Sequence, residues 1–326
     1  MSRGKKRGGG GKLVLGGLVL AAIVIAIIAL VFGLTRTQTP PVPGGPTPTP
    51  GPEEPQAQPA SCPDVQVISV PGTWESSPTD DPHHPTANPA ALLLNVTGPL
   101  QEQFPESRVD VMTVPYVAQF ARPMAPPEAT YDDSRAQGKA AAENMIRDRT
   151  AECPLTNFVL MGFSQGAVIA GDIASDIGNG VATAPISADR VLGVGLIADG
   201  RRDTTAPAAG LNLGVPGGKG AEVLLAGLNL GPLMPGTTMT GPRPGGFGVL
   251  ADRAVQICAP GDLICDAPAE VLTNLVGTIA QLSTAASAPI HAIYHTNPII
   301  DGTTATAYLT DWAAGLIQNA PTPAHN

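Results

Sequence analysis

Short apolar segments alternate with longer amphipathic segments along the chain beyond residue 60. Five apolar segments are rich in β-branched residues, which is typical of strands covered on both faces of a sheet. These predicted strands are Val65–Val70, Val109–Val114, Asn157–Met161, Val191–Ile197 and Ala254–Cys258. The predicted helices are Ser134–Thr150, Gln165–Ile177, Glu270–Ala285 and Thr306–Gln318. Strands that alternate with helices predict an α/β fold around a mostly parallel five-stranded sheet.

The longest uncharged segment lies near the start of the chain. Leu13–Leu34 has 22 residues without a charge, and as a helix it would span about 33 Å, enough to cross a bilayer core of about 30 Å. A cleaved signal peptide is the alternative, but its apolar core would be shorter and would end in a small-residue cleavage site. We therefore predict a single membrane-spanning helix, with the basic residues before it in the cytoplasm and the rest of the chain outside.

Between residues 35 and 60 the composition changes to proline, threonine and glycine, with nine prolines. Such a segment cannot form helices or sheet ladders, which predicts an extended, semi-rigid linker. We therefore divide the chain into a basic cytoplasmic segment (1–12), a membrane anchor (13–34), a linker (35–60), one folded domain (61–318) and a tail (319–326).

The charge distribution excludes nucleic acid as a partner. Five basic residues and no acidic ones precede residue 13, so the rest of the chain carries 13 basic and 27 acidic residues, a net charge of −14. Affinity for DNA or RNA comes largely from lysine and arginine side chains that neutralise phosphates. A domain this acidic lacks the surface that such binding needs.

Four cysteines follow the predicted anchor and so face an oxidising compartment, where disulfides persist. Three pairings are possible in principle. Cys62 precedes the first predicted strand and Cys153 the third, so neighbouring parallel strands would bring these two together, while Cys258 and Cys265 bracket a short loop. Zinc is the competing use of four cysteines, but no CxxC pair is present and the spacing fits zinc poorly. We predict the disulfides Cys62–Cys153 and Cys258–Cys265.

One motif carries the chemistry of an activated hydroxyl. Gly162-Phe163-Ser164-Gln165-Gly166 follows a predicted strand directly and opens a predicted helix. In this GxSxG pattern the glycines permit a sharp turn that exposes the serine oxygen above the sheet. Ser164 is therefore the candidate nucleophile.

A serine hydroxyl needs a neighbouring base, and in this motif the chain order is serine, then an acid, then a histidine. Only His291 and His295 lie downstream of Ser164 within the predicted domain. For the acid we select Asp262, which lies inside the loop between Cys258 and Cys265, just after the last predicted strand. The alternative for Asp262 is a turn residue after a glycine.

Together these segments resemble the cutinases, small serine esterases of the α/β-hydrolase fold, and in particular the membrane-anchored cutinase-like proteins of mycobacteria and related actinobacteria. The similarity extends from about Ser61 to Ala314. It rests on four segments: Cys-Pro-Asp-Val leading into Pro71–Glu75, Cys153 followed by Gly-Phe-Ser-Gln-Gly-Ala, the Cys-x-x-Gly-Asp-x-x-Cys loop, and Ala288–Tyr294. The resemblance implies a three-layer sandwich.

The resemblance also implies roles for individual residues. Ser164 matches the nucleophile, Asp262 the acid and His291 the base, since the family spacing His-x-x-Tyr fits His291 and not His295. Thr73 and the main-chain N–H of Gln165 match the oxyanion hole. Glu75 is expected to orient the loop that carries Thr73.

The expected activity is hydrolysis of lipid acyl esters (lipase, phospholipase A or thioesterase type) through an acyl-enzyme on the outer side of the membrane, by a monomeric domain. No metal or organic cofactor is needed for this chemistry. Two alternatives stay open: an acyltransferase of the cell envelope that uses the same triad, and a non-catalytic lipid-binding envelope protein.

One long segment departs from compact cutinases. Arg201–Gly248 is rich in glycine, proline and alanine, with apolar residues at Val223–Leu230 and Leu233–Met234. Loops of this length are uncommon in compact domains and are often lids or binding loops. The segment is expected to be either a lid over an acyl chain or an exposed surface excursion.

Overall fold

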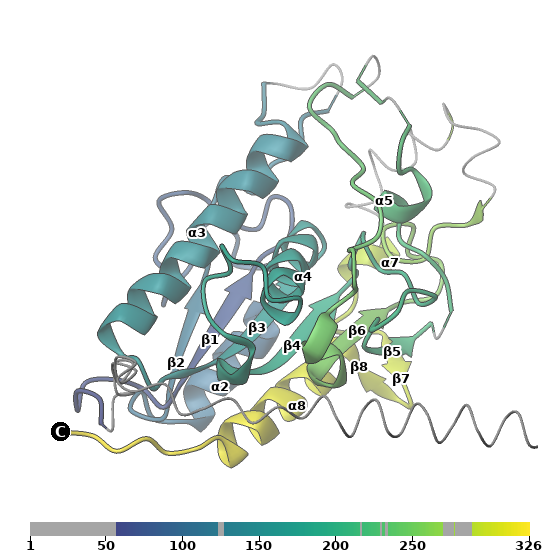
Figure 1. Cartoon of the computed structure of the whole chain (residues 1–326). Helices are drawn as coiled ribbons and strands as arrows, with labels where there is room; N and C mark the ends of the chain where they lie inside the picture. Colours follow the sequence, from purple (N-terminus) through teal and green to yellow (C-terminus); the bar gives the residue numbers. More distant parts are fainter. Residues whose placement is uncertain are drawn as a thin grey trace, which may run out of the picture. The chain divides into compact units, whose positions relative to one another are not determined.

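The centre of the fold is a six-stranded sheet in which every neighbouring pair is parallel, in the order β2-β1-β3-β4-β6-β5 (Figure 1). The computed structural model describes residues 57–122, 127–215, 217–228, 230–231, 234–269, 277 and 289–326. The six strands are β1 (Val65–Val70), β2 (Val109–Thr113), β3 (Asn157–Phe163), β4 (Val191–Ile197), β5 (Leu211–Gly214) and β6 (Ala254–Cys258). A two-stranded antiparallel sheet follows near the end of the chain, formed by β7 (Pro298–Ile300) and β8 (Thr303–Thr304).

The predicted count of five strands is wrong, because β5 adds a sixth. Leu211–Gly214 pairs in parallel with β6 and forms one edge of the sheet. This strand lies inside the segment expected to lack regular structure. It has only four residues and only partial burial, so its strand conformation comes from backbone pairing with β6 rather than from an apolar run. Hydrophobic periodicity in a sequence indicates which residues are buried, so it does not predict a strand that is formed mainly by backbone pairing.

The helices are α2 (Leu94–Gln103), α3 (Tyr131–Glu152), α4 (Gln165–Gly178), α5 (Ala221–Leu224), α7 (Pro289–Ala292) and α8 (Ala305–Asn319), with short 3-10 turns η1 (Ala188–Arg190) and η2 (Gly248–Arg253). Three predicted helices are present as α3, α4 and α8. The fourth, Glu270–Ala285, lies almost entirely outside the described residues. Helix α2 was not predicted, and it contains Pro99, a residue that disfavours helix interiors.

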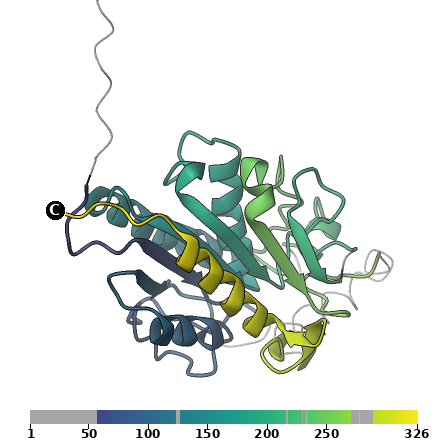
Figure 2. The same cartoon turned by 90° about the horizontal axis from the view of Figure 1, so that it is seen from below.

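Helices cover both faces of the sheet, which gives the three layers of the expected sandwich. Alternate residues of each strand point to opposite faces, so Val67 packs in one apolar cluster and Ile68 in another. The cluster that includes Val67 is closed by α2 and α8, and the cluster that includes Ile68 by α3 and α4. Figure 2 shows α8, in yellow, lying along one face.

The ends of the folded unit meet at the amino ends of the strands. Gln58 pairs with His325 in a parallel bridge, and its N–H donates to the Ala324 carbonyl at 2.9 Å. Cys62 and Cys153, just before β1 and β3, form a disulfide with 5.5 Å between their Cα atoms. The predicted pairing of these two cysteines is confirmed, for the expected reason that β1 and β3 are parallel neighbours.

The described residues include no helix that is both long and apolar enough to cross a membrane. The predicted cytoplasmic segment, the predicted anchor at 13–34 and all but the last residues of the predicted linker lie outside the described residues.

Candidate active site

The turn between β3 and α4 holds Ser164 in a strained conformation at the carboxyl end of the sheet. Its φ of 55° is unusual for a residue with a side chain. The Ser164 N–H donates to the Ile197 carbonyl of β4 at 2.9 Å, which fixes the turn to the neighbouring strand. A Cβ on Gly162 would lie 2.3 Å from the Gly166 carbonyl oxygen, and one on Gly166 would lie 2.0 Å from that of Val70. Both glycines of the motif are therefore required by close backbone contacts.

The structure brings Ser164, His291 and Asp262 together in a hydrogen-bonded chain. His291 Nε2 lies 2.9 Å from Ser164 Oγ, and His291 Nδ1 lies 2.8 Å from Asp262 Oδ2. All three side chains are buried, with 5% of Ser164, 2% of His291 and 0% of Asp262 exposed. His295, the rival candidate, is exposed. The imidazole also stacks on Phe163, with ring centroids 4.9 Å apart.

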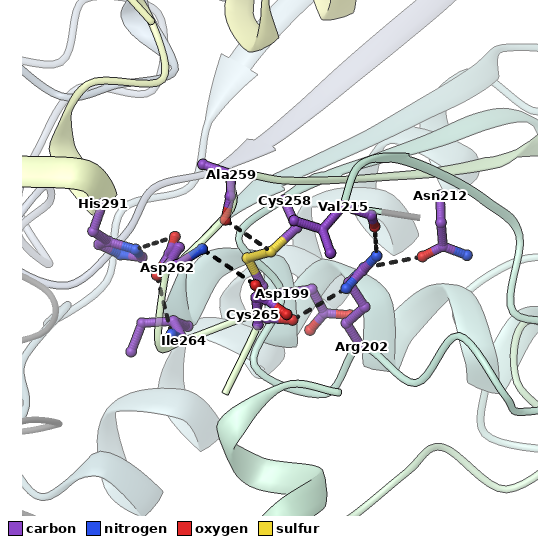
Figure 3. The surroundings of a disulfide bond; sticks show 12 residues. Asp199, Arg202, Asn212, Val215, Cys258, Ala259, Asp262, Ile264, Cys265 and His291 are labelled. Atoms are coloured by element: carbon purple, nitrogen blue, oxygen red, sulfur yellow. Dashed lines mark hydrogen bonds and ion pairs between the residues drawn. A yellow bond between two sulfur atoms is a disulfide. The ribbon is translucent and has the colours of Figure 1, made fainter. Parts of the chain in front are cut away.

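Asp262 is held by a small covalent loop. Cys258, the last residue of β6, is joined to Cys265, which confirms the second predicted disulfide (Figure 3). Within the loop the Ile264 N–H donates to Asp262 Oδ1 at 3.0 Å. Buried Arg202 donates to the Cys265 carbonyl at 3.3 Å and fixes the loop from outside. The carboxylate therefore has one oxygen bound by its own loop and the other directed at the imidazole.

Tyr294 completes the surroundings of the carboxylate. Its hydroxyl donates to Asp262 Oδ2 at 2.6 Å and accepts from the Ala259 N–H at 2.9 Å. Burial alone would raise the pKa of Asp262, but the charge of His291 and hydrogen bonds from the imidazole, the tyrosine and a main-chain N–H hold it below its usual value. Burial, and then the Asp262 charge, raise the pKa of Tyr294, which keeps the hydroxyl protonated as a donor.

The loop after β1 carries Thr73 to the same end of the sheet. Glu75 fixes this loop from inside: its carboxylate accepts from the Gly72 N–H and from the Leu92 N–H, both at 2.9 Å. Burial raises the pKa of Glu75, partly offset by these two hydrogen bonds. The next residue after Thr73, Trp74, has a φ of 63°. Glu75 thus occupies the position expected of a residue that orients the Thr73 loop.

Gln165 begins α4, so its main-chain N–H is one of the helix's first four, which have no acceptor within the helix. Its side chain is turned away and fixed, accepting from Ser134 Oγ at 2.8 Å and donating to the Gln119 carbonyl at 3.1 Å. Thr73, Ser164 and Gln165 line one pocket together. Main-chain and hydroxyl donors therefore lie beside the candidate nucleophile.

Comparison with known proteins identifies the family. The family profile described as Cutinase matches residues 61–290. The chain belongs to the cutinase family. A carboxylesterase Culp6 homolog of Corynebacterium glutamicum is 47% identical over 306 residues, which are 93% of this chain and 96% of the relative. Cutinases hydrolyse carboxylic esters with a serine nucleophile, and this chain is a serine carboxylic-ester hydrolase.

A solved structure supports the cutinase-like α/β-hydrolase fold of the chain. An iodinated complex of acetyl xylan esterase is 18% identical with a TM-score of 0.50, and the match covers 79% of this chain and 100% of that one. A cutinase-like protein from Cryptococcus sp. is 16% identical with a TM-score of 0.46, over 83% of this chain and 100% of that one. Because the identity to the acetyl xylan esterase is low, that likeness concerns the fold alone.

A cavity of about 70 Å³ opens beside Ser164 in this cutinase. Its lining is mainly apolar: Trp74, Phe120, Val168, Ala221, Met234, Met239 and Ile264, with Thr73, Tyr131, Gln165, Gly200 and Glu222 completing it. Four of these residues (Ala221, Glu222, Met234 and Met239) come from the segment 201–248. That segment therefore contributes both a sheet strand and part of the pocket.

Sequence reasoning missed two groups of residues near the site. Tyr294 was used only for its spacing from His291, and its contact with Asp262 was not foreseen. Glu222 and Arg243 were also missed, although Arg243 is a lone charge in a segment of glycine, proline and apolar residues. An isolated charge in such surroundings is a signal of a buried ion pair. No cluster of three or more potential metal ligands occurs in the part of the chain that the structure describes.

Proposed function

We propose that Ser164, His291 and Asp262 form the catalytic triad of this esterase. The observation that carries the proposal is the unbroken hydrogen-bonded chain from Ser164 Oγ through both imidazole nitrogens to Asp262 Oδ2. An ionised carboxylate can only accept, so Nδ1 carries the proton and Nε2 is free to accept one from the serine. The low pKa of Asp262 supports this, since it keeps the carboxylate ionised.

The reaction proceeds through an acyl-enzyme. As Ser164 Oγ attacks the ester carbonyl, its proton passes to His291 Nε2, and Asp262 stabilises the resulting imidazolium. His291 then gives the proton to the leaving alkoxide oxygen, which departs as an alcohol and leaves the acyl group on the serine. In the second half, His291 takes a proton from water, the hydroxide attacks the acyl carbonyl, and the proton returns to Ser164.

The oxyanion that forms in each half-reaction is held by Thr73 and the main-chain N–H of Gln165. Both residues line the pocket beside Ser164, and the N-terminus of α4 favours negative charge at this point. Removal of a single oxyanion donor typically costs about 10²–10³ in kcat. Glu75 acts by fixing the loop on which Thr73 lies.

We assign lipid acyl esters as the substrate class. The support is the apolar lining of the pocket, which suits a hydrocarbon chain better than a sugar or a peptide. Two disulfides and the apolar segment at 13–34 favour a domain attached to the outer side of a membrane, where lipid esters are at hand.

Acyl transfer to an alcohol is the second candidate. It is favoured by the burial of the triad, since Ser164 is only 5% exposed and limited access of water protects an acyl-enzyme from hydrolysis. Incubation of the enzyme with a labelled ester and an acceptor such as trehalose or a lipid alcohol separates the two. Free acid as the main product supports hydrolysis, and transferred product formed faster than free acid contradicts it.

The triad is tested with Ser164→Ala and Asp262→Asn in the full-length chain. The first change should abolish both ester turnover and labelling by a fluorophosphonate, and the second should lower kcat by about 10⁴-fold, since the imidazole is then held in the wrong tautomer. Ser187→Ala, at an exposed serine before η1, is the matched control and should behave as wild type. Substantial turnover by Ser164→Ala would refute the assignment.

A further inference from the structure

The segment 201–248 forms part of the pocket wall. The contacts that hold this segment in place therefore determine which substrates fit the pocket. Met239 contacts two apolar clusters. One contains buried Leu230 and Met234 packed against Phe120. The other contains Ala221 and Leu225 and extends to Ile264 of the acid loop. The wall is therefore packed on both the Phe120 loop and the loop that carries Asp262.

Buried ion pairs of Arg243 attach this segment to the core of the domain. The guanidinium, 6% exposed as a residue, donates to Asp172 of α4 at 2.8 Å and to both oxygens of Asp199 at 2.5 and 3.1 Å. Burial alone would lower the pKa of Arg243, but these two carboxylates raise it above its usual value. Arg201 also donates to Asp172, at 2.7 Å, and to the Gly241 carbonyl at 2.8 Å. Breaking one partner of a buried pair is strongly unfavourable, so this end of the segment is firmly held.

A second set of polar contacts lies in the pocket wall itself, around Glu222. Both carboxylate oxygens of Glu222 have partners: Tyr131 donates its hydroxyl to Oε1, while Arg135 at 3.2 Å and the Thr240 hydroxyl at 2.9 Å donate to Oε2. Tyr131 and Arg135 belong to α3. Asp132 of the same helix accepts from the N–H and the hydroxyl of Thr238, at 2.9 and 2.8 Å. The residues on either side of Met239 are thus tied to α3.

We propose that the described part of the segment 201–248 is a fixed wall of the acyl pocket and that Met234 and Met239 limit the length of the acyl chain. The bonds from Glu222, Thr238 and Arg243 hold these methionines in the lining of the pocket beside Ser164. Acyl chains long enough to meet the two methionines are therefore disfavoured by contact with them. This inference rests on the proposed esterase function.

The test is the chain-length profile of the full-length enzyme on p-nitrophenyl esters from acetate to palmitate. For the wild type, kcat/KM should rise to a maximum within this series and then fall once the acyl chain meets the two methionines. Met239→Ala should move the maximum to longer chains, and Met239→Trp should move it to shorter ones. Each change should alter the ratio of long-chain to short-chain kcat/KM by at least about tenfold. Met239 is only partly buried, so these variants should fold.

Met145→Ala is the matched control. Met145 is also partly buried but packs against the α3–α4 face of the core, away from the pocket lining. The change should lower stability without changing the profile. A profile that is the same in wild type and both Met239 variants would overturn this inference while leaving the esterase function intact. A wild-type enzyme that hydrolyses none of the esters would instead contradict the proposed function.

Discussion

The two ends of the parallel sheet are built differently. At the amino ends of the strands, the Cys62–Cys153 disulfide joins segments 91 residues apart in sequence, and Gln58 pairs with the C-terminal residues. At the carboxyl ends, the Cys258–Cys265 disulfide closes a span of only seven residues and carries Asp262. One end joins distant parts of the chain, and the other shapes a local loop around a functional side chain.

Backbone strain is more frequent at the carboxyl end, although Ala208, just before β5, also has a positive φ of 53°. Trp74, Ser164 and Ala198 have positive φ values of 63°, 55° and 57°, and each lies in the turn after a strand, at the carboxyl end of the sheet. A non-glycine residue in this region costs of order 1–3 kcal/mol, which the rest of the fold must offset. The long-range disulfide and the paired chain ends stabilise the fold at the amino end. This stability offsets the strain at the carboxyl end, where side chains are held for chemistry.

The largest effect should follow from breaking the amino-end disulfide. In the chain-entropy model a bridge across 91 residues contributes about 4–5 kcal/mol to the free energy of unfolding. Cys62→Ala/Cys153→Ala should lose about that amount in urea unfolding, measured on the full-length chain. The kcat of the folded fraction should remain close to wild type, because the bridge lies at the opposite end of the sheet from Ser164. A large fall in kcat with unchanged stability would show that the two ends are not separable.

Breaking the carboxyl-end disulfide should lower kcat more than it lowers stability. The bridge closes a short loop, so Cys258→Ala/Cys265→Ala should cost only about 2–3 kcal/mol of stability. Its main effect should be on kcat, since freeing the loop displaces Asp262, and a misplacement of about 1 Å can cost about 10²-fold. The measurement is kcat at a temperature where the unfolding curve shows the variant fully folded. Wild-type kcat under those conditions would mean that Arg202 and the Ile264 N–H position the carboxylate without the disulfide.

Much of the carboxyl end could be predicted from sequence because its chemistry lies in local motifs. Ser164, Asp262 and His291 each stand in a short recognisable segment, and the chain order of the three residue types reduced the candidates to a few. The five predicted strands were apolar runs. The sixth, Leu211–Gly214, was missed because pairing with β6 forms it.

The pocket wall could not be predicted, because it depends on contacts between distant residues. Arg135 and Glu222 are 87 residues apart, and Asp132 and Thr238 are 106 apart. A hydropathy pattern carries no information about which distant charges will pair. From sequence, the segment 201–248 could be either a lid or a surface excursion. The structure shows its hydrogen bonds and ion pairs to α3 and α4.

The smallest expected effect concerns the Tyr294 hydroxyl, which links the acid to the end of β6. Tyr294→Phe keeps the ring but removes the hydrogen bond to Asp262 Oδ2 and leaves the buried Ala259 N–H without its acceptor. Loss of a hydrogen bond to a charged group costs about 2 kcal/mol. The free energy of unfolding should fall by about that amount, and kcat should fall less than tenfold, because His291 and Asp262 remain in contact.

The pH dependence of stability shows whether Tyr294 stabilises the protein through its hydrogen bond to ionised Asp262 or only through packing. The pKa of Asp262 in the folded enzyme lies below the ordinary value of 3.8, so its stabilising contribution is fully present above that value and is lost as the pH falls through the lowered pKa. Without the tyrosine hydroxyl the folded pKa moves up toward 3.8, so the variant has less of this contribution to lose in acid. The difference in unfolding free energy between wild type and Tyr294→Phe should therefore be largest at neutral pH and should narrow below pH 3.8. A difference that stayed constant across this range would show that Tyr294 stabilises the loop by packing rather than through the charge of Asp262.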